Sequence, residues 1–186
     1  MRFEEAVRRA YQIPGMCWPS ELGALYRLFH GSMRHVEVGA FCGRSLFTTA
    51  MVLGRDAELI IVEPFLGCDA EEFPLPGPQW QQQVLLATAS AINHHRPDVQ
   101  VQFFNYTSLE ALPMIGTCQT CYIDGDHGFA ECSADIVGYQ AITTQTLAGH
   151  DYWPAIPSVM EAVNQNLEKF RVLPKTRIWV AEEPTL

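Results

Sequence analysis

Four consecutive apolar residues, Leu59-Ile60-Ile61-Val62, limit the fold of this chain more than any other stretch of its sequence. The stretch shows no alternation of polar and apolar positions, which is typical of a parallel strand covered on both faces. Strands are also predicted at 35–38, 99–103, 122–123 and 144–148, with helical periodicity between them. Strands alternating with helices predict an α/β fold with a doubly wound, mostly parallel sheet and right-handed crossovers.

The two ends of the chain depart from this alternation. Residues 1–33 are expected to form helices, one of them with Ser20 as the candidate cap at its start. Near the C-terminus, the apolar spacing over 156–170 predicts a last helix. Two short β-rich runs, 171–173 and 177–180, follow it. They predict a C-terminal antiparallel hairpin, which brings the sheet to seven strands.

Length and composition narrow the class of protein. A chain of 186 residues can bury one sizeable core and is short for two, so we expect a single domain over 1–186, with the sheet core at 34–186. The net charge of −9 disfavours nucleic acid as a partner, because an acidic surface repels phosphate. No run approaches the roughly 20 apolar residues that span a bilayer, and no secretory pattern is present, so we expect no membrane association and a cytoplasmic location.

The six cysteines show no spacing typical of a disulfide framework, so they are expected to be reduced. Cys118 and Cys121 form one closely spaced pair. A structural zinc site usually needs four ligands, and the sequence offers no second pair to complete one. The sequence therefore predicts buried, inert thiols.

Polar residues or glycines follow the predicted parallel strands. Because the carboxyl ends of parallel strands lie at one edge of a sheet, these residues should lie along that edge. They are Gly39, Glu63, Asn105, Asp124 and Asp151.

The turn from Gly39 to Gly43 joins a strand to a helix, but its G-x-x-x-G spacing places Phe41 where a dinucleotide fingerprint requires a second glycine. NAD and FAD are therefore disfavoured. Glu63, 20 residues after Gly43, ends the next strand, where its carboxylate can accept both hydroxyls of a ribose. A site for adenosine without pyrophosphate indicates S-adenosylmethionine, although paired glycines after a strand also occur for packing alone.

Four motifs make the resemblance to a known family specific. In order along the chain, they are VEVGAFCGRS at 36–45, IVEPF at 61–65, IDGDH at 123–127 and AGHDY at 148–152. They resemble the class I S-adenosylmethionine-dependent methyltransferases, above all the group often labelled methyltransferase family 24. The resemblance covers roughly residues 15–182 and implies a Rossmann-like class I methyltransferase domain.

The resemblance also implies a cofactor site. Glu37 and Gly39 would contact the methionine part of S-adenosylmethionine, Glu63 the ribose, and residues 106–108 the adenine, with the loop at 64–78 closing over it. The full set of cofactor-binding candidates is Glu37, Gly39, Ala40, Phe41, Gly43, Ser45, Glu63, Thr107, Ser108 and Asp124.

Two features depart from the family pattern. Thr143-Thr144-Gln145 stands where the family has a Pro-Gly-Gly turn, which leaves the register of the following strand open. The acidic, proline-rich loop at 66–78 is individual to this chain, so the substrate pocket is unassigned.

Two acids and two histidines at the next strand ends are the candidate catalytic and metal-binding residues. His127 is the candidate base and Asp124 its catalytic partner, because an alcohol must lose its proton before it attacks the sulfonium methyl group. Asp124, His150 and Asp151 are the candidate ligands for Mg²⁺ or Mn²⁺, which carboxylates suit. The resemblance to metal-dependent O-methyltransferases implies an Asp on the first loop and an acidic pair on the next strand, where His150 replaces one acid in this chain. Helix capping and turn formation are the structural alternatives for the same residues.

The sequence thus predicts O-methylation of a small molecule or a sugar hydroxyl. A noncatalytic cofactor-binding domain with an assembly or regulatory role is the first alternative. A different metal-dependent reaction on the same scaffold, such as hydroxylation, is the second. A homo-oligomer is expected to complete the pocket, because the fold is minimal and has no cap domain.

Overall fold

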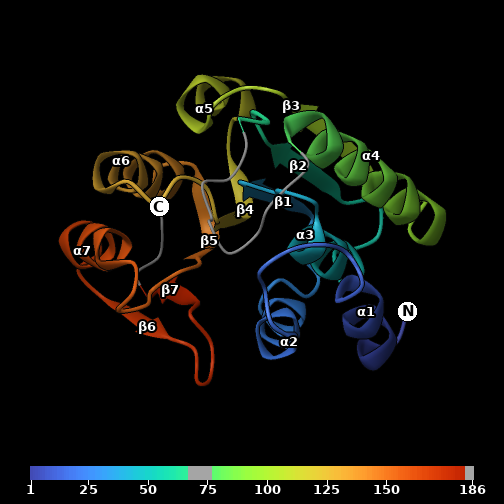
Figure 1. Cartoon of the computed structure of the whole chain (residues 1–186), viewed down its shortest axis with the longest axis horizontal. Helices are drawn as coiled ribbons and strands as arrows, with labels where there is room; N and C mark the ends of the chain where they lie inside the picture. Colours follow the sequence, from blue (N-terminus) through green and yellow to red (C-terminus); the bar gives the residue numbers. More distant parts are fainter. Residues whose placement is uncertain (67–76, 183–186) are drawn as a thin grey trace.

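The computed structural model describes residues 1–66 and 77–182, and Figure 1 shows their arrangement. The strands are β1 (Arg34–Val38), β2 (Glu58–Val62), β3 (Gln100–Phe104), β4 (Cys118–Ile123), β5 (Thr143–Gly149), β6 (Phe170–Val172) and β7 (Trp179–Ala181). The helices are α1 (Phe3–Ala10), α2 (Pro19–Leu28), α3 (Arg44–Ala50), α4 (Pro78–His95), α5 (Ser108–Ile115), α6 (Phe129–Gln140) and α7 (Pro157–Asn166). None of these helices is both long enough and apolar enough to cross a membrane.

The seven strands form one sheet in the order β3-β2-β1-β4-β5-β7-β6. The first five strands along the chain pair in parallel, and β7 pairs antiparallel with both β5 and β6. The prediction of a doubly wound, mostly parallel seven-stranded sheet with a C-terminal antiparallel hairpin is confirmed. The strand order reverses between β1 and β4, and a ligand site is expected at such a switch point.

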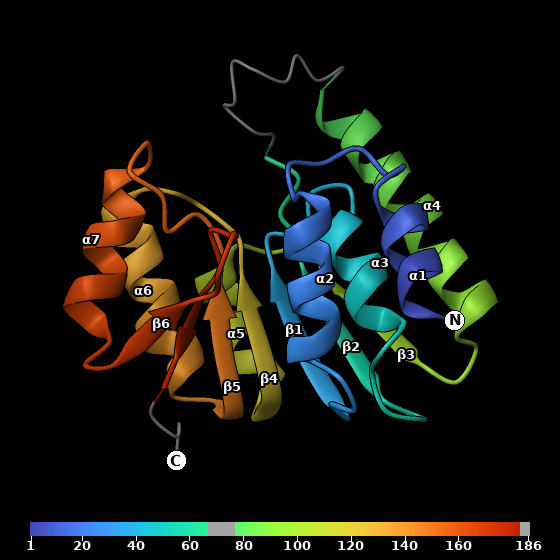
Figure 2. The same cartoon turned by 90° about the horizontal axis from the view of Figure 1, so that it is seen from below.

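Helices cover both faces of the sheet, with α1 to α4 on one side and α5 to α7 on the other (Figures 1 and 2). Successive residues of β2 therefore enter different cores. Leu59 and Ile61 pack with the first group of helices, and Ile60 and Val62 with the second. This division explains why β2 is apolar at every position from Leu59 to Val62.

The structure settles the register of β5. Ile123 pairs with Gly149, so Asp124 and His150 follow at neighbouring strand ends. A shift in pairing between Cys118 and Thr120 absorbs the irregular start of the strand. Thr143 lies where the family has its Pro-Gly-Gly turn. Its buried hydroxyl donates to the carbonyl of Tyr139 at 2.7 Å, and this hydrogen bond holds the start of β5.

Two boundary predictions are wrong. Helix α2 begins at Pro19, so Ser20 lies inside its first turn, and the carboxylate of Glu21 accepts the Trp18 N–H at 2.8 Å instead. The last helix ends at Asn166, because Phe170 already belongs to strand β6. In the described residues five cysteines are free and buried, as predicted, and the inertness of their thiols stays a prediction.

Candidate functional site

A cavity of about 360 Å³ opens at the carboxyl ends of β1, β2, β4 and β5, which is where the strand order reverses. Its volume lies in the range of small-molecule sites. Residues from the N-terminal segment, the glycine turn and the strand ends line it: Gly15, Met16, Cys17, Gly39, Ala40, Phe41, Arg44, Ser45, Glu63, Pro64, Leu66, Gln81, Asp124, Gly125, Asp126, His127, Gly128, His150 and Asp151. The predicted loop closure lies largely outside the described residues, since it falls mostly on 67–76.

Gly39 allows the ends of β1 and β4 to meet at the floor of this cavity. Its φ is +79°, and a side chain at this position would collide with the carbonyl of Asp124. The Asp124 N–H in turn donates to the carbonyl of Val38 at 2.8 Å. Gly39 therefore holds the Asp124 loop against the glycine turn.

Glu63 lies at the end of β2 with its carboxylate held by backbone donors. The N–H groups of Phe41 and Phe65 donate to its two oxygens at 2.7 and 2.9 Å. Burial raises the pKa of this carboxyl, and the two backbone donors oppose that shift. The glycine turn thus fixes one carboxylate at the wall of the cavity, 6% exposed.

Glu37 lies behind the same wall on β1 and is fully buried. The Ser45 hydroxyl donates to its Oε1 at 2.6 Å, and Oε2 has no hydrogen-bond partner. Burial raises the pKa of this carboxyl to about 8. Ser45 lines the cavity, so its hydroxyl links the buried carboxyl of Glu37 to the cavity.

Four predicted cofactor residues lie outside the cavity lining: Glu37, Gly43, Thr107 and Ser108. Gly43 precedes the first residue of α3 with a φ of +87°, and Leu85 and Thr88 of α4 pack against it. Thr107 is exposed and precedes the first residue of α5, Ser108. Its hydroxyl donates to Glu110 at 2.8 Å. Contact of Thr107 and Ser108 with adenine stays a prediction.

Asp151 is the centre of the charges at the other side of the cavity. Its carboxylate lies 2.9 Å from Nε2 of His127, 3.2 Å from Nδ1 of His150 and 3.2 Å from Nη1 of Arg177. Burial alone would raise its pKa, but the hydrogen bonds from His127 and His150 hold the pKa well below its usual range. Asp151 is therefore ionised and lies beside two imidazoles and one guanidinium.

The structure brings Asp124 and His127 to this group as the sequence predicts. Ligand atoms of Asp124, His127 and Asp151 all lie within 4.8 Å of one another. The His127 side chain is 44% exposed, and the hydrogen bond to Asp151 raises its pKa. The carboxylate of Asp126, on the same loop, accepts the Gly128 N–H at 2.6 Å.

His150 lies deeper than the sequence suggested, and only 3% of its side chain is exposed. Its Nδ1 lies 3.4 Å from Asp124, and its Nε2 lies 3.2 Å from Oε1 of Glu21 on α2. Burial would lower the pKa of this imidazole, but the charge of Asp124 and the contact with Asp151 raise it well above its ordinary value. Of the three predicted metal ligands, Asp124 and Asp151 therefore lie nearest to His127, and His150 lies behind them.

Sequence reasoning missed Glu21 and Arg177. The Arg177 backbone N–H and Nε both donate to Oε1 of Glu21 at 3.1 Å. Burial acts to raise the pKa of Glu21, but His150 and Arg177 together lower it to about 2. A signal for Glu21 existed, because it lies four residues before Leu25 and so shares the apolar face of α2. The sequence around Arg177 gives no indication that this residue contacts the site.

Comparison with known proteins gives matches among solved structures. No family model and no curated protein sequence matches this chain. An O-methyltransferase from Bacillus cereus in complex with SAH is similar at a TM-score of 0.61 and 14% identity, over 96% of this chain and 89% of that one. A putative caffeoyl-CoA O-methyltransferase from Staphylococcus aureus is similar at 0.65 and 11%, over 97% and 91%.

A third similar structure has a different activity in its name. The precorrin 8w decarboxylase of Methanobacterium thermoautotrophicum is similar at a TM-score of 0.61 and 12% identity, over 91% of this chain and 92% of that one. Likenesses at this level of identity establish a common fold and leave the chemistry to the site. This chain has the Rossmann-like fold of the class I S-adenosylmethionine-dependent methyltransferases.

Proposed function

We propose that this chain is an S-adenosylmethionine-dependent methyltransferase that methylates a hydroxyl oxygen of a small molecule or a sugar, as one domain over residues 1–186. One observation carries the proposal. A single cavity at the switch point joins the glycine turn and Glu63 to the acid–histidine group of Asp124, His127 and Asp151. The first part suits an adenosyl group with a methionine tail, and the second suits removal of a proton.

The reaction follows from these roles. His127 accepts the proton of the acceptor hydroxyl, and Asp151 orients the imidazole through the 2.9 Å contact. The oxygen attacks the methyl carbon of the sulfonium, and the bond from carbon to sulfur breaks with its electron pair going to sulfur. An ether and the neutral thioether result.

The residues present fit the cofactor. Oε2 of Glu37 has no hydrogen-bond partner, and the ammonium group of the methionine tail would supply one directly or through water and would favour the ionised carboxylate. The carboxylate of Glu63 has acceptor capacity left for ribose hydroxyls, because it accepts two backbone N–H groups and the Gln81 side chain, and a carboxylate has about four acceptor positions. Gly39, Ala40 and Phe41 line the same cavity.

Substituting Glu63 by glutamine tests the cofactor site. We expect the affinities for S-adenosylmethionine and its demethylated product to fall by about 10- to 100-fold in calorimetry, because hydrogen bonds to a charged group are lost. Glu58→Gln is the matched control. It lies at the other end of β2, 36% exposed and 3.2 Å from Arg34, and it should bind as the unsubstituted protein does. Equal affinities in all three proteins, or no binding at all, would contradict the proposal.

A divalent cation, Mg²⁺ or Mn²⁺, is the finer part of the proposal. The carboxylates of Asp124 and Asp151 have ligand atoms within 4.8 Å of each other and offer the oxygen ligands that such an ion prefers, and an ion there would lower the pKa of an acceptor hydroxyl. Asp124 and Asp151 would hold it. His150 is the weaker candidate, since its Nδ1 already lies 3.2 Å from Asp151 and its Nε2 faces Glu21 rather than this site.

Removing the cation tests this part. We expect a chelator to lower the methyl-transfer rate by about 100-fold and added Mg²⁺ to restore it. The Asp124→Asn protein should be as slow without chelator and should not respond to Mg²⁺, with cofactor affinity nearly unchanged. Asp126→Asn is the control from the same loop. Full activity in chelator would remove the cation from the mechanism and leave His127 as the base.

The noncatalytic alternative predicts cofactor binding without turnover. Labelled S-adenosylmethionine offered with a panel of phenols and glycans separates the two, because any methylated product excludes it. One structure of similar fold is named as a decarboxylase, so a different reaction on this fold is the second alternative. Substrate consumption without demethylated cofactor would favour that reading.

A further inference from the structure

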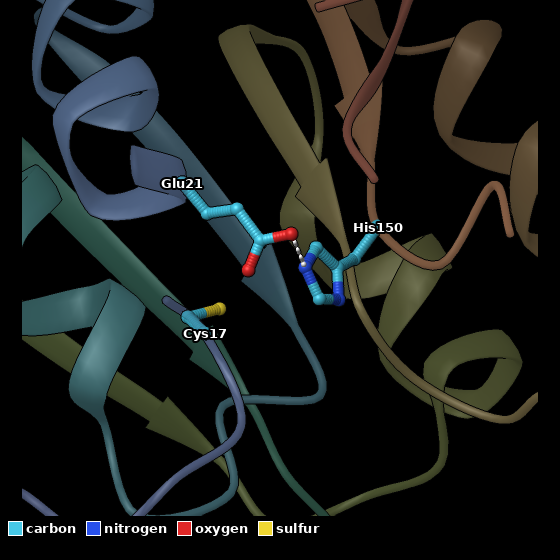
Figure 3. A group of neighbouring side chains, drawn as sticks. All are labelled: Cys17, Glu21 and His150. Carbon is cyan, nitrogen blue, oxygen red and sulfur yellow. Dashed lines mark ion pairs between the residues drawn. The ribbon is translucent and has the colours of Figure 1, made fainter. Parts of the chain in front are cut away.

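A second group of ligand-type side chains lies beside the acid–histidine group. It includes His150, and the proposed methyl transfer uses neither of the other two members, Cys17 and Glu21. Figure 3 shows Cys17, Glu21 and His150 pointing toward one another, from the segment before α2, from α2 and from the end of β5. The Cys17 Sγ, one Glu21 carboxylate oxygen and one His150 ring nitrogen lie within 4.8 Å of one another. All three residues are buried, at 5%, 1% and 4% exposure.

The orientation of His150 is that of a metal ligand. Its buried Nε2 lies 3.2 Å from Oε1 of Glu21 as an ion pair that does not have hydrogen-bond geometry. Its Nδ1 lies 3.2 Å from Asp151 and 3.4 Å from Asp124. A carboxylate behind the second ring nitrogen is the usual support of a metal-bound histidine, because it fixes the tautomer and the ring plane.

We propose that Cys17, Glu21 and His150 bind one Zn²⁺ ion. Cysteine sulfur, imidazole nitrogen and a carboxylate oxygen are ligands that zinc takes together, whereas Mg²⁺ requires oxygen. Ligand atoms around tetrahedral zinc lie about 3.5 Å apart, and the 3.2 Å between Glu21 and His150 is close to that. Cys17 and His150 both line the cavity, so a fourth position would open toward it.

The charges of the buried group allow the ion. Zinc would take the place of the Cys17 thiol proton and of a proton on His150, so the net charge of the group stays the same. Burial raises the pKa of Cys17 to about 12, which keeps the thiol neutral without an ion, and a coordinating thiol is deprotonated. Oε1 of Glu21 would exchange its contact with Nε of Arg177 for the ion, and Nη1 of Arg177 retains Asp151 at 3.2 Å.

The experiment uses the full chain freed of metal by a chelator and then given Zn²⁺ alone. We expect one zinc per chain after gel filtration, and an X-ray absorption spectrum with one sulfur neighbour at about 2.3 Å. Co²⁺ in place of Zn²⁺ should give a thiolate-to-metal charge-transfer band. Cys17→Ser should weaken zinc binding by about 100-fold and remove the band. None of these measurements depends on methyl transfer.

Two controls locate the ion. Cys132→Ser removes another buried thiol, whose pKa burial likewise raises to about 12, and it should bind zinc as the unsubstituted protein does. His127→Ala removes a ligand of the neighbouring acid–histidine group and should also leave zinc binding unchanged. Zinc without a sulfur neighbour, binding retained in Cys17→Ser, or binding lost in His127→Ala would overturn the proposal. The absorption spectrum of the unsubstituted protein decides the matter even if Cys17→Ser fails to fold.

Discussion

His127→Ala is expected to reduce kcat for methyl transfer by about 10²- to 10⁴-fold, the usual contribution of a positioned general base. The imidazole lines the cavity, is 44% exposed, and is oriented by Asp151 at 2.9 Å. It can therefore reach an acceptor hydroxyl in a way that the buried His150 cannot. Steady-state kinetics with the acceptor found in the panel gives the measurement.

The same substitution should leave the cofactor site intact. Cofactor contacts are assigned to the glycine turn and to Glu63, so the affinity for S-adenosylmethionine should change by less than about threefold, or under 1 kcal/mol. His94→Ala, on the exposed face near the end of α4, is the control for loss of an imidazole. Added imidazole should restore part of the rate to His127→Ala and none to Asp124→Asn. An unchanged kcat would exclude His127 as the base.

The order of elements could be predicted because it depends on local patterns. Leu59 to Val62 has the composition of a strand buried on both faces, and the two cores that share its side chains are the reason. Gly39, Glu63, Asp124 and Asp151 could be placed at one edge because parallel strands all end there. That reasoning needs only the direction of each strand.

The partners of Asp151 could not be predicted in the same way. Arg177 reaches it because β7 pairs antiparallel with β5 and sets Gly149 opposite Trp179. Trp179 Nε1 also donates to the carbonyl of His150 at 3.2 Å, which fixes the strand end. Pairing of this kind depends on which edge the hairpin joins, and residue spacing within the hairpin carries no information about it.

The depth of His150 depends on tertiary packing in a similar way. Helix α2 packs over the sheet so that Glu21 faces His150, although the two residues are far apart in sequence. The helical pattern indicates which face of α2 is buried, and a carboxylate on that face signals a buried cationic partner. The identity of that partner required the structure.

Glu37→Gln is expected to stabilise the protein at pH 8 by about 2–4 kcal/mol. The pKa of Glu37 is raised from an ordinary value of 4.5 to about 8, chiefly because the group is fully buried. Between these two values the unfolded chain has lost the proton while the folded protein keeps it. The folded state thus binds more protons, and the free energy of unfolding falls as pH rises from about 4.5 to about 8.

The size of the effect follows from the same pKa values. A difference of about 3.5 pH units corresponds to about 5 kcal/mol at most, at about 1.4 kcal/mol per unit. Glutamine has no proton to lose, so this loss disappears. An amide in place of the unpartnered Oε2 costs about 1–3 kcal/mol in return, which gives the expected net gain. Urea unfolding at pH 5, 6, 7 and 8 should show the two proteins diverging as pH rises.

Cofactor binding should move in the opposite direction. Burial of Glu37 lowers the free energy of unfolding, and its proposed role is to hold the methionine part of the cofactor. Glu37→Gln should therefore bind S-adenosylmethionine about 10-fold more weakly. Ser45→Ala is the comparison, since it removes the 2.6 Å hydrogen bond and should lower stability and affinity together. A variant that is more stable and binds less tightly cannot be explained by misfolding. Equal pH dependence in Glu37→Gln and the unsubstituted protein would show that Glu37 ionises normally in the folded state.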